Sequence, residues 1–180
     1  MKKFLLLILI ILSNYLNGQK INFYSVAGKI TANPHTSRIV EGVDVNAFAN
    51  KLCYTLSYQV GEEFGLEIFS DSPVETYRDL SIRVGGYNLY RRWRLQYQSG
   101  LSYVKGIKRT KELDLLNSTF LTNYYFTEKF ETIGIPLFFG WRYLPFKFMG
   151  IGMDFFVNIN LERSFFRPCV VLEIGLLRAR

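Results

Sequence analysis

The feature that most constrains this chain is a strict alternation of apolar and polar residues along several segments. It is clearest over residues 147–160, where the even positions are mostly glycine, aspartate and asparagine and the odd positions carry Met149, Ile151, Met153, Phe155, Val157 and Ile159. Successive side chains point to opposite faces only in a β-strand. This segment is therefore predicted to be a strand with one apolar face and one polar face.

The same period of two recurs along the rest of the chain. It predicts further strands at residues 52–60, 79–88, 92–105, 131–143 and 166–178, and less distinct strands at 20–30 and 40–48. Aromatic residues make up 17% of the chain, which favours strands over helices. The sequence thus predicts an all-β protein of about eight strands.

The connections between these strands also alternate, in length. Tight turns are predicted at 49–51, 89–91 and 144–146, and longer connections at 31–37, 70–75, 106–126 and 161–165. Tight turns at one end and longer loops at the other are typical of outer-membrane barrels. The predicted fold is therefore a single antiparallel up-and-down transmembrane β-barrel.

The beginning of the chain has the pattern of a secretory signal peptide. Two lysines precede an apolar run over residues 4–12, and a polar stretch follows. The run is about half as long as the roughly 20 residues that a membrane-spanning helix needs. Cleavage after Gly18 would divide the chain into a signal peptide, 1–18, and an outer-membrane barrel domain, 19–180.

The polar face of the strands is predicted to line the inside of the barrel. An eight-stranded barrel is only just wide enough inside for side chains, so the many bulky apolar residues fit better outside, against lipid. Opposite charges can pair in a narrow lumen. The predicted lumen network consists of Asp44, Asp79, Arg83, Arg94, Arg142, Asp154, Arg167 and Glu173. Within it we expect Asp154 and Glu173 to pair with Arg142 or Arg167, and the glycines of this face to make room for arginine.

Three aromatic residues of the apolar face, Trp93, Trp141 and Tyr143, lie beside predicted tight turns. This position is typical of the aromatic girdle at a membrane interface. Alternation alone also fits a second architecture, in which the apolar face points inward. The alternative is thus a soluble periplasmic barrel of the lipocalin type that carries an apolar ligand.

The C-terminal third of the chain resembles a known family. The resemblance rests on Ile133-Gly134-Ile135-Pro136-Leu137, Asn158-Ile159-Asn160 and Ile174-Gly175-Leu176-Leu177-Arg178. These motifs are similar to those of the small outer-membrane β-barrel proteins of Bacteroidetes-type bacteria, the outer membrane protein beta-barrel domain family. The resemblance implies an outer-membrane location and a barrel of eight or a similar number of strands. Because Pro136 cannot donate a backbone hydrogen bond, we expect a β-bulge there.

The sequence contains few residues that could carry chemistry. Its one histidine, His35, lies beside a proline in a polar stretch, and no glycine-rich phosphate loop precedes a helix. Asp154 and Glu173 could form an acid–base pair, but pairing with arginine is the simpler interpretation. We therefore expect neither an enzyme nor a metal or other cofactor. Cys53 and Cys169 share the polar face and either fill space in the lumen or form a disulfide across it.

Two features of the long connection, 106–126, bear on partners. A basic polar stretch at its start contains Lys105, Lys108, Arg109 and Lys111, which form either a solvated loop or a contact with anionic lipid or sugar headgroups. Its aromatic end either recognises a partner or continues the strands beyond the membrane.

The predicted function is that of an integral outer-membrane barrel with a structural or surface-interaction role, in adhesion or in support of a secretion system. Its partners would be the lipid bilayer of the outer membrane and a protein of the cell surface or of a secretion system. An exported chain rarely meets nucleic acid, so nucleic acid is not an expected partner.

Overall fold

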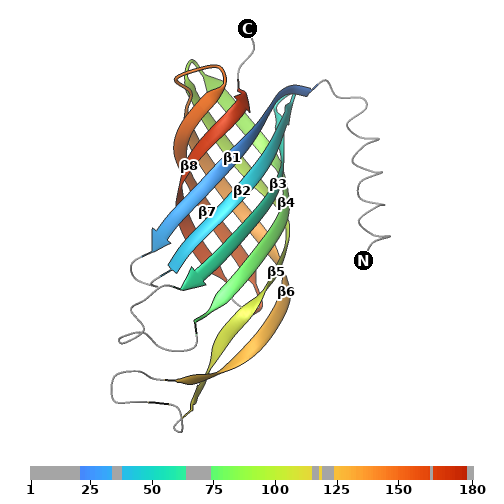
Figure 1. Cartoon of the computed structure of the whole chain (residues 1–180). Coiled ribbons are helices and arrows are strands. Elements are labelled where there is room, and N and C mark those ends of the chain that lie inside the picture. The colour runs from blue at the N-terminus through green and yellow to red at the C-terminus, as the bar shows by residue number, and fades with distance from the viewer. Residues whose placement is uncertain are drawn as a thin grey trace.

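The computed structural model describes residues 21–33, 38–63, 74–114, 118, 124–162 and 164–177. The predicted signal peptide and His35 lie outside these residues. The described residues form eight strands: β1 (Ile21–Asn33), β2 (Arg38–Ala49), β3 (Leu52–Glu63), β4 (Thr76–Tyr90), β5 (Trp93–Leu113), β6 (Tyr125–Tyr143), β7 (Met149–Asn160) and β8 (Phe165–Leu176). Each strand pairs antiparallel with its neighbour in sequence, and β1 pairs antiparallel with β8 (Figure 1). The prediction of a closed, antiparallel, up-and-down barrel is confirmed.

Of the two segments with indistinct alternation, 20–30 and 40–48, residues 21–30 belong to β1 and residues 40–48 to β2. The largest departure from the predicted boundaries is in β5 and β6, which continue to Leu113 and from Tyr125. Residues 106–113 and 125–126 of the predicted long connection are thus strand, and the hairpin of β5 and β6 projects beyond the other strands (Figure 1). Of the aromatic end of this connection, Tyr125 continues a strand, as the first residue of β6, whereas Leu115, Leu116 and Phe120 lie outside the described residues.

The tight turns lie together at one end of the barrel, at the top of Figure 1, where β1 begins and β8 ends. Only two residues connect β2 to β3 and β4 to β5, and the first residue of each pair, Asn50 and Arg91, has a positive φ of 55° and 54°. This end is called the turn end below, and the opposite end, with the longer connections, is called the loop end.

The expectation of a β-bulge at Pro136 is wrong. Pro136 lies opposite Asn158 in β7, and the pairing of β5 with β6 keeps one register from Ser99 and Leu137 to Ser102 and Gly134. The ladder continues on both sides of Pro136 and only the two intervening pairs are missing. The register shift between β5 and β6 lies near the loop end, between Arg109 and Leu113.

Three glycines of the inner face serve a different purpose from the predicted one. A Cβ at Gly85, Gly100 or Gly152 would lie 1.9 Å from a backbone carbonyl oxygen of the neighbouring strand. Close approach of two strands, and not space for an arginine side chain, therefore requires glycine at these positions.

The two faces of the barrel wall differ sharply in composition. The outward side chains are apolar, as in β6, where Ile133 is 71% exposed and Ile135 is 53% exposed. The inward side chains include buried arginine, aspartate, glutamate and glutamine. This is the orientation that the sequence predicts. Among the described residues, no helix is both long and apolar enough to cross a membrane.

Candidate functional site

The interior of the barrel contains a chain of buried ion pairs that begins at Lys29 on β1. The ammonium nitrogen of Lys29 lies 2.5 Å from Asp44 Oδ2 on β2 and 2.9 Å from Asp154 Oδ2 on β7. Arg83 on β4 reaches the same oxygen of Asp44, with Nη2 at 2.5 Å. Two carboxylates thus hold two cations in the middle of the lumen.

The chain continues through Arg142 on β6. Its Nη1 lies 2.5 Å from Asp154 Oδ1, and its Nε lies 3.3 Å from Glu173 Oε2 on β8. Arg94 on β5 pairs with the same oxygen of Glu173, and the Ser25 hydroxyl donates a hydrogen bond to Oε1. These contacts join seven charged side chains into one network: Lys29, Asp44, Arg83, Arg94, Arg142, Asp154 and Glu173.

A second, smaller group of polar side chains lies nearer the loop end. Arg167 Nη2 is 3.3 Å from Asp79 Oδ2, and its Nη1 donates a 2.8 Å hydrogen bond to the hydroxyl of Tyr77. The amide of Asn158 donates to Asp79 at 3.2 Å and to Ser102 at 2.7 Å. Arg167 therefore pairs with Asp79, and not with Asp154 or Glu173.

Aromatic rings inside the lumen cover the guanidinium groups. Arg83 lies 4.3 Å from the ring centre of Phe138, Arg94 lies 4.6 Å from that of Phe48, and Arg167 lies 3.9 Å from that of Phe165. Rings at these distances attract cations through their quadrupoles. They also occupy the space that a water-filled channel would need.

Apolar clusters close the lumen on both sides of the charged network. At the turn end, Phe23, Phe48 and Cys53 pack together with Tyr87. At the loop end, the buried cluster consists of Val40, Tyr77, Val104 and Phe130, with Phe165 packed against it. Cys53 and Cys169 are both buried and free, and Cys169 packs in a third cluster with Ala27 and Val171. They fill space in the lumen and form no disulfide.

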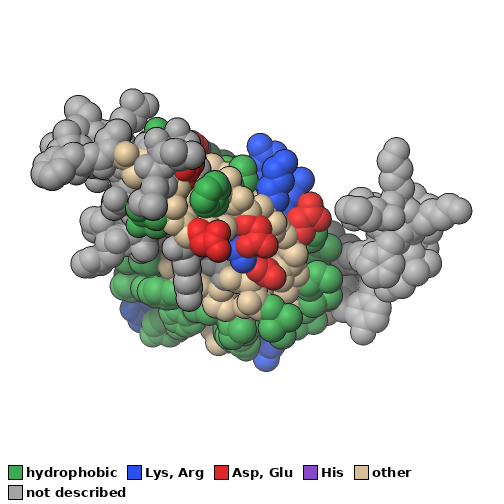
Figure 2. All heavy atoms as spheres, turned by 90° about the horizontal axis from the view of Figure 1, so that it is seen from below, with side chains coloured by type: hydrophobic (Ala, Val, Ile, Leu, Met, Phe, Trp, Pro, Cys, Tyr) green, Lys and Arg blue, Asp and Glu red, His purple; other side chains and the backbone are tan. Residues whose placement is uncertain are grey.

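Charged side chains gather again at the loop end, where Figure 2 shows acidic and basic groups side by side. Arg109 Nη1 lies 2.8 Å from Glu63 Oε2, and the backbone N–H of Arg109 donates to Glu75 at 2.8 Å. Lys108 pairs with Glu162 at 2.7 Å, and this hydrogen-bonded carboxylate raises the pKa of Lys108. These contacts tie the base of the β5–β6 hairpin to β3 and to the β7–β8 connection.

The three predicted girdle residues lie together on the outer surface near the turn end. The rings of Trp93 and Trp141 stack with centres 5.1 Å apart, and Tyr143 lies 4.8 Å from Trp93. Trp93 is 42% exposed and Trp141 45%.

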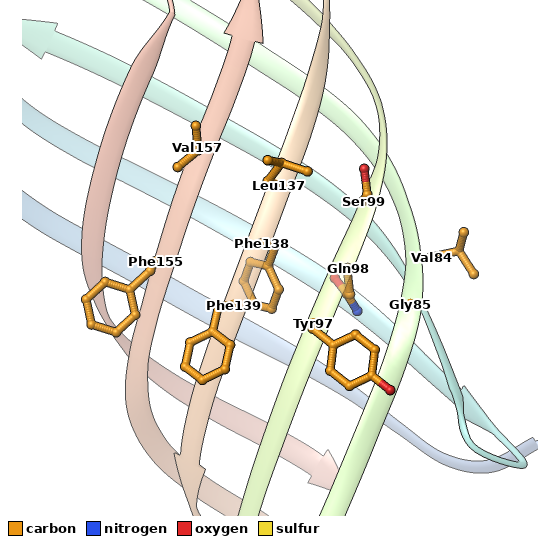
Figure 3. Close-up of a pocket in the computed structure, with 10 residues that line it drawn as sticks. All are labelled: Val84, Gly85, Tyr97, Gln98, Ser99, Leu137, Phe138, Phe139, Phe155 and Val157. Carbon is orange, nitrogen blue, oxygen red and sulfur yellow. The ribbon is translucent and has the colours of Figure 1, made fainter.

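A hollow of about 500 Å³ is present on the outer wall across β4 to β7 (Figure 3). Tyr97, Phe139 and Phe155 lie in one row across three neighbouring strands of its floor. The hollow is open and forms part of the exposed apolar surface. Its polar residues therefore do not surround an enclosed space in which they could bind a ligand together.

Sequence reasoning missed Lys29, which connects two carboxylates of the network. The alternation in β1 is obscured because apolar residues, Phe23 and Ala27, share the inward face with Ser25 and Lys29. The signal that could have identified Lys29 is the spacing of the outward residues. Tyr24, Val26, Gly28 and Ile30 occupy every second position, which places Lys29 on the inward face. Within the described ranges, no group of three or more His, Cys, Asp or Glu residues is placed to hold a metal ion.

Comparison with known proteins places the fold among outer-membrane barrels. The N-terminal β-barrel domain of Pseudomonas aeruginosa OprF superposes with a TM-score of 0.59 at 11% identity, covering 87% of this chain and 99% of that one. Neisserial surface protein A gives a TM-score of 0.56 at 9% identity, covering 87% and 97%. Ail, the attachment invasion locus protein of Yersinia pestis, gives 0.51 at 10% identity, covering 87% and 96%.

These similarities are of fold alone. No protein-family model matches the chain, and no curated protein matches it in sequence. The resemblance to the Bacteroidetes-type family therefore stays a prediction.

Proposed function

We propose that this chain is an integral outer-membrane protein whose barrel is closed by its own side chains and which acts at the cell surface. The observation that carries the proposal is the arrangement of side chains in the barrel wall. Apolar residues point outward, and a buried network of paired charges points inward, the reverse of a soluble protein. Contact of so continuous an apolar surface with water is unfavourable, whereas the hydrocarbon of a lipid bilayer suits it. Export through a signal peptide at 1–18 completes the proposal.

The surface role is assigned to the loop end. In outer-membrane barrels the short turns face the periplasm and the longer loops face outward. Here the loop end carries the projecting β5–β6 hairpin and its anchoring ion pairs with Glu63 and Glu162. Two of the similar structures are by name a surface protein and an attachment protein, which supports adhesion or support of a secretion system as the role.

The alternative function, a soluble carrier of an apolar ligand, is wrong for this structure. A lipocalin-like barrel needs an apolar interior, whereas this interior holds Lys29, Arg83, Arg94 and Arg142 with their carboxylate partners. We further propose that the protein is not an enzyme, because the acidic side chains of the lumen are engaged by basic ones and lie between apolar clusters.

Cell fractionation tests the location. The full chain, expressed with its N-terminal segment, is expected in washed outer membranes, from which only detergent releases it. The folded barrel should also migrate differently on gels before and after boiling. Release into the soluble periplasmic fraction would contradict the proposal.

Epitope tags test which end acts at the surface. A tag placed after Glu162, at the loop end, should be stained on intact cells. The matched tag after Lys51, at the turn end, should be stained only after the outer membrane is permeabilised. The reverse pattern would assign the surface role to the turn end.

A further inference from the structure

The outer wall of β4, β5 and β6 carries an apolar band with a sharp boundary towards the loop end. Tyr90, Trp93 and Tyr143 lie in one cross-strand row at the turn end. Ten residues farther along each strand, Leu80, Tyr103 and Ile133 form a second row. A strand rises ~3.4 Å per residue. Ten residues of a strand tilted by about 40° from the barrel axis therefore span roughly 26 Å along that axis, which is close to the height of the lipid-facing band in outer-membrane barrels.

The next outward row beyond this band is charged on all three strands. Arg78 lies opposite Lys105, and Lys105 lies opposite Glu131. All three side chains are exposed. Lys129 is the next outward residue of β6 and is exposed as well. These residues therefore lie where the hydrocarbon ends and the headgroups of the outer leaflet begin.

Two like charges directly opposite each other in an antiparallel sheet repel, because their Cβ atoms are only about 5 Å apart. Among the described residues, neither Arg78 nor Lys105 has a carboxylate within ion-pair distance. Glu131 accepts a 2.7 Å hydrogen bond from the hydroxyl of Tyr103 and forms no ion pair with Lys105. The cationic pair thus lacks an anion from the barrel itself.

We propose that Arg78 and Lys105, assisted by Lys129, bind the phosphate group of an anionic lipid in the outer leaflet. The inference rests on the proposed membrane location, because the lipid source follows from the position of the cations at the edge of the apolar band. Arginine offers two parallel N–H donors to phosphate oxygens, and lysine adds a mobile point charge. The acyl chains of the same lipid would lie along the outward residues on the turn-end side of the two cations, Leu80, Leu101 and Tyr103.

The test uses the full-length protein reconstituted in phosphatidylcholine vesicles, with spin-labelled phosphatidic acid and spin-labelled phosphatidylcholine as probes. The wild type is expected to associate preferentially with phosphatidic acid, with about a fivefold contribution from each of the two cations. The double variant Arg78→Gln, Lys105→Gln should lose this preference, and Arg78→Lys should retain most of it. The control variant Lys51→Gln, Lys147→Gln also removes two positive charges, but from two turns at the turn end, and it should behave as wild type.

The outcomes separate this inference from the proposed function. Failure of the wild type to insert into vesicles would overturn the membrane location itself. Insertion without a preference for phosphatidic acid, or an equal loss in the double variant and the control, would overturn only the lipid site. Millimolar inorganic phosphate should leave the preference intact, and its abolition by free phosphate would contradict a lipid as the source.

Discussion

At the scale of single residues, Glu173 is the carboxylate that two guanidinium groups share. It contacts Arg94 and Arg142, which are both almost completely buried. Replacement by glutamine keeps the shape and removes the charge. Because removing one partner of a buried pair leaves an uncompensated charge, Glu173→Gln is expected to lower the free energy of unfolding by about 3–5 kcal/mol.

Urea unfolding of the reconstituted protein, followed by tryptophan fluorescence, measures this change. Glu41→Gln is the matched control, since Glu41 is exposed and no basic side chain of the described residues lies within ion-pair distance of it. Its effect should stay within about 0.5 kcal/mol. Equal stability of the Glu173 variant and the wild type would show that the lumen network contributes no stability.

The sequence could assign the charged residues to one face, because alternation fixes which side chains share a side of a strand. It could not assign most partners. Arg94 and Glu173 come from β5 and β8, and Arg167 meets Asp79 of β4, so these contacts cross the lumen between strands that are not neighbours. Such pairings depend on how the closed barrel staggers its strands, which a single strand's pattern does not contain.

At the scale of the strands, glycine sets how closely two backbones approach. A Cβ on Gly152 would lie 1.9 Å from the carbonyl oxygen of Trp141, whereas a Cβ on Gly28 would have its nearest neighbour at 4.0 Å. Gly152→Ala must therefore displace a backbone, at a cost of about 1–3 kcal/mol, and Gly28→Ala should be neutral or slightly stabilising. The heat-modifiable folded fraction after refolding into detergent measures both, and an equal yield for the two variants would contradict this explanation.

The sequence also predicted the number of strands but not their ends. Within the apolar band the alternation is strong, because the outward side chains are apolar and most of the inward ones are polar. Beyond Lys105 the residues of both faces of β5 are half-exposed over 106–110, so the contrast disappears although the strand continues to Leu113. The same reason explains why β6 begins before the predicted residue 131.

At the scale of the whole molecule, two apolar clusters and the network between them fill the lumen. Open aqueous channels are formed by barrels of about 16 strands, and this barrel has eight. The purified protein in a planar lipid bilayer is therefore expected to show no persistent porin-like conductance. Long-lived open steps in the wild type would show that the interior described here is not closed.

The central claim is that the apolar face of the wall contacts lipid, and brominated lipids test it directly. The native pair Trp93 and Trp141 should be quenched most strongly by bromine near the headgroups. In a Trp93→Phe, Trp141→Phe background, Ile135→Trp places one tryptophan in the middle of the band, and bromine deep in the acyl chains should quench it most. Quenching of all three positions by aqueous acrylamide, with no effect of brominated lipid at either depth, would contradict the account.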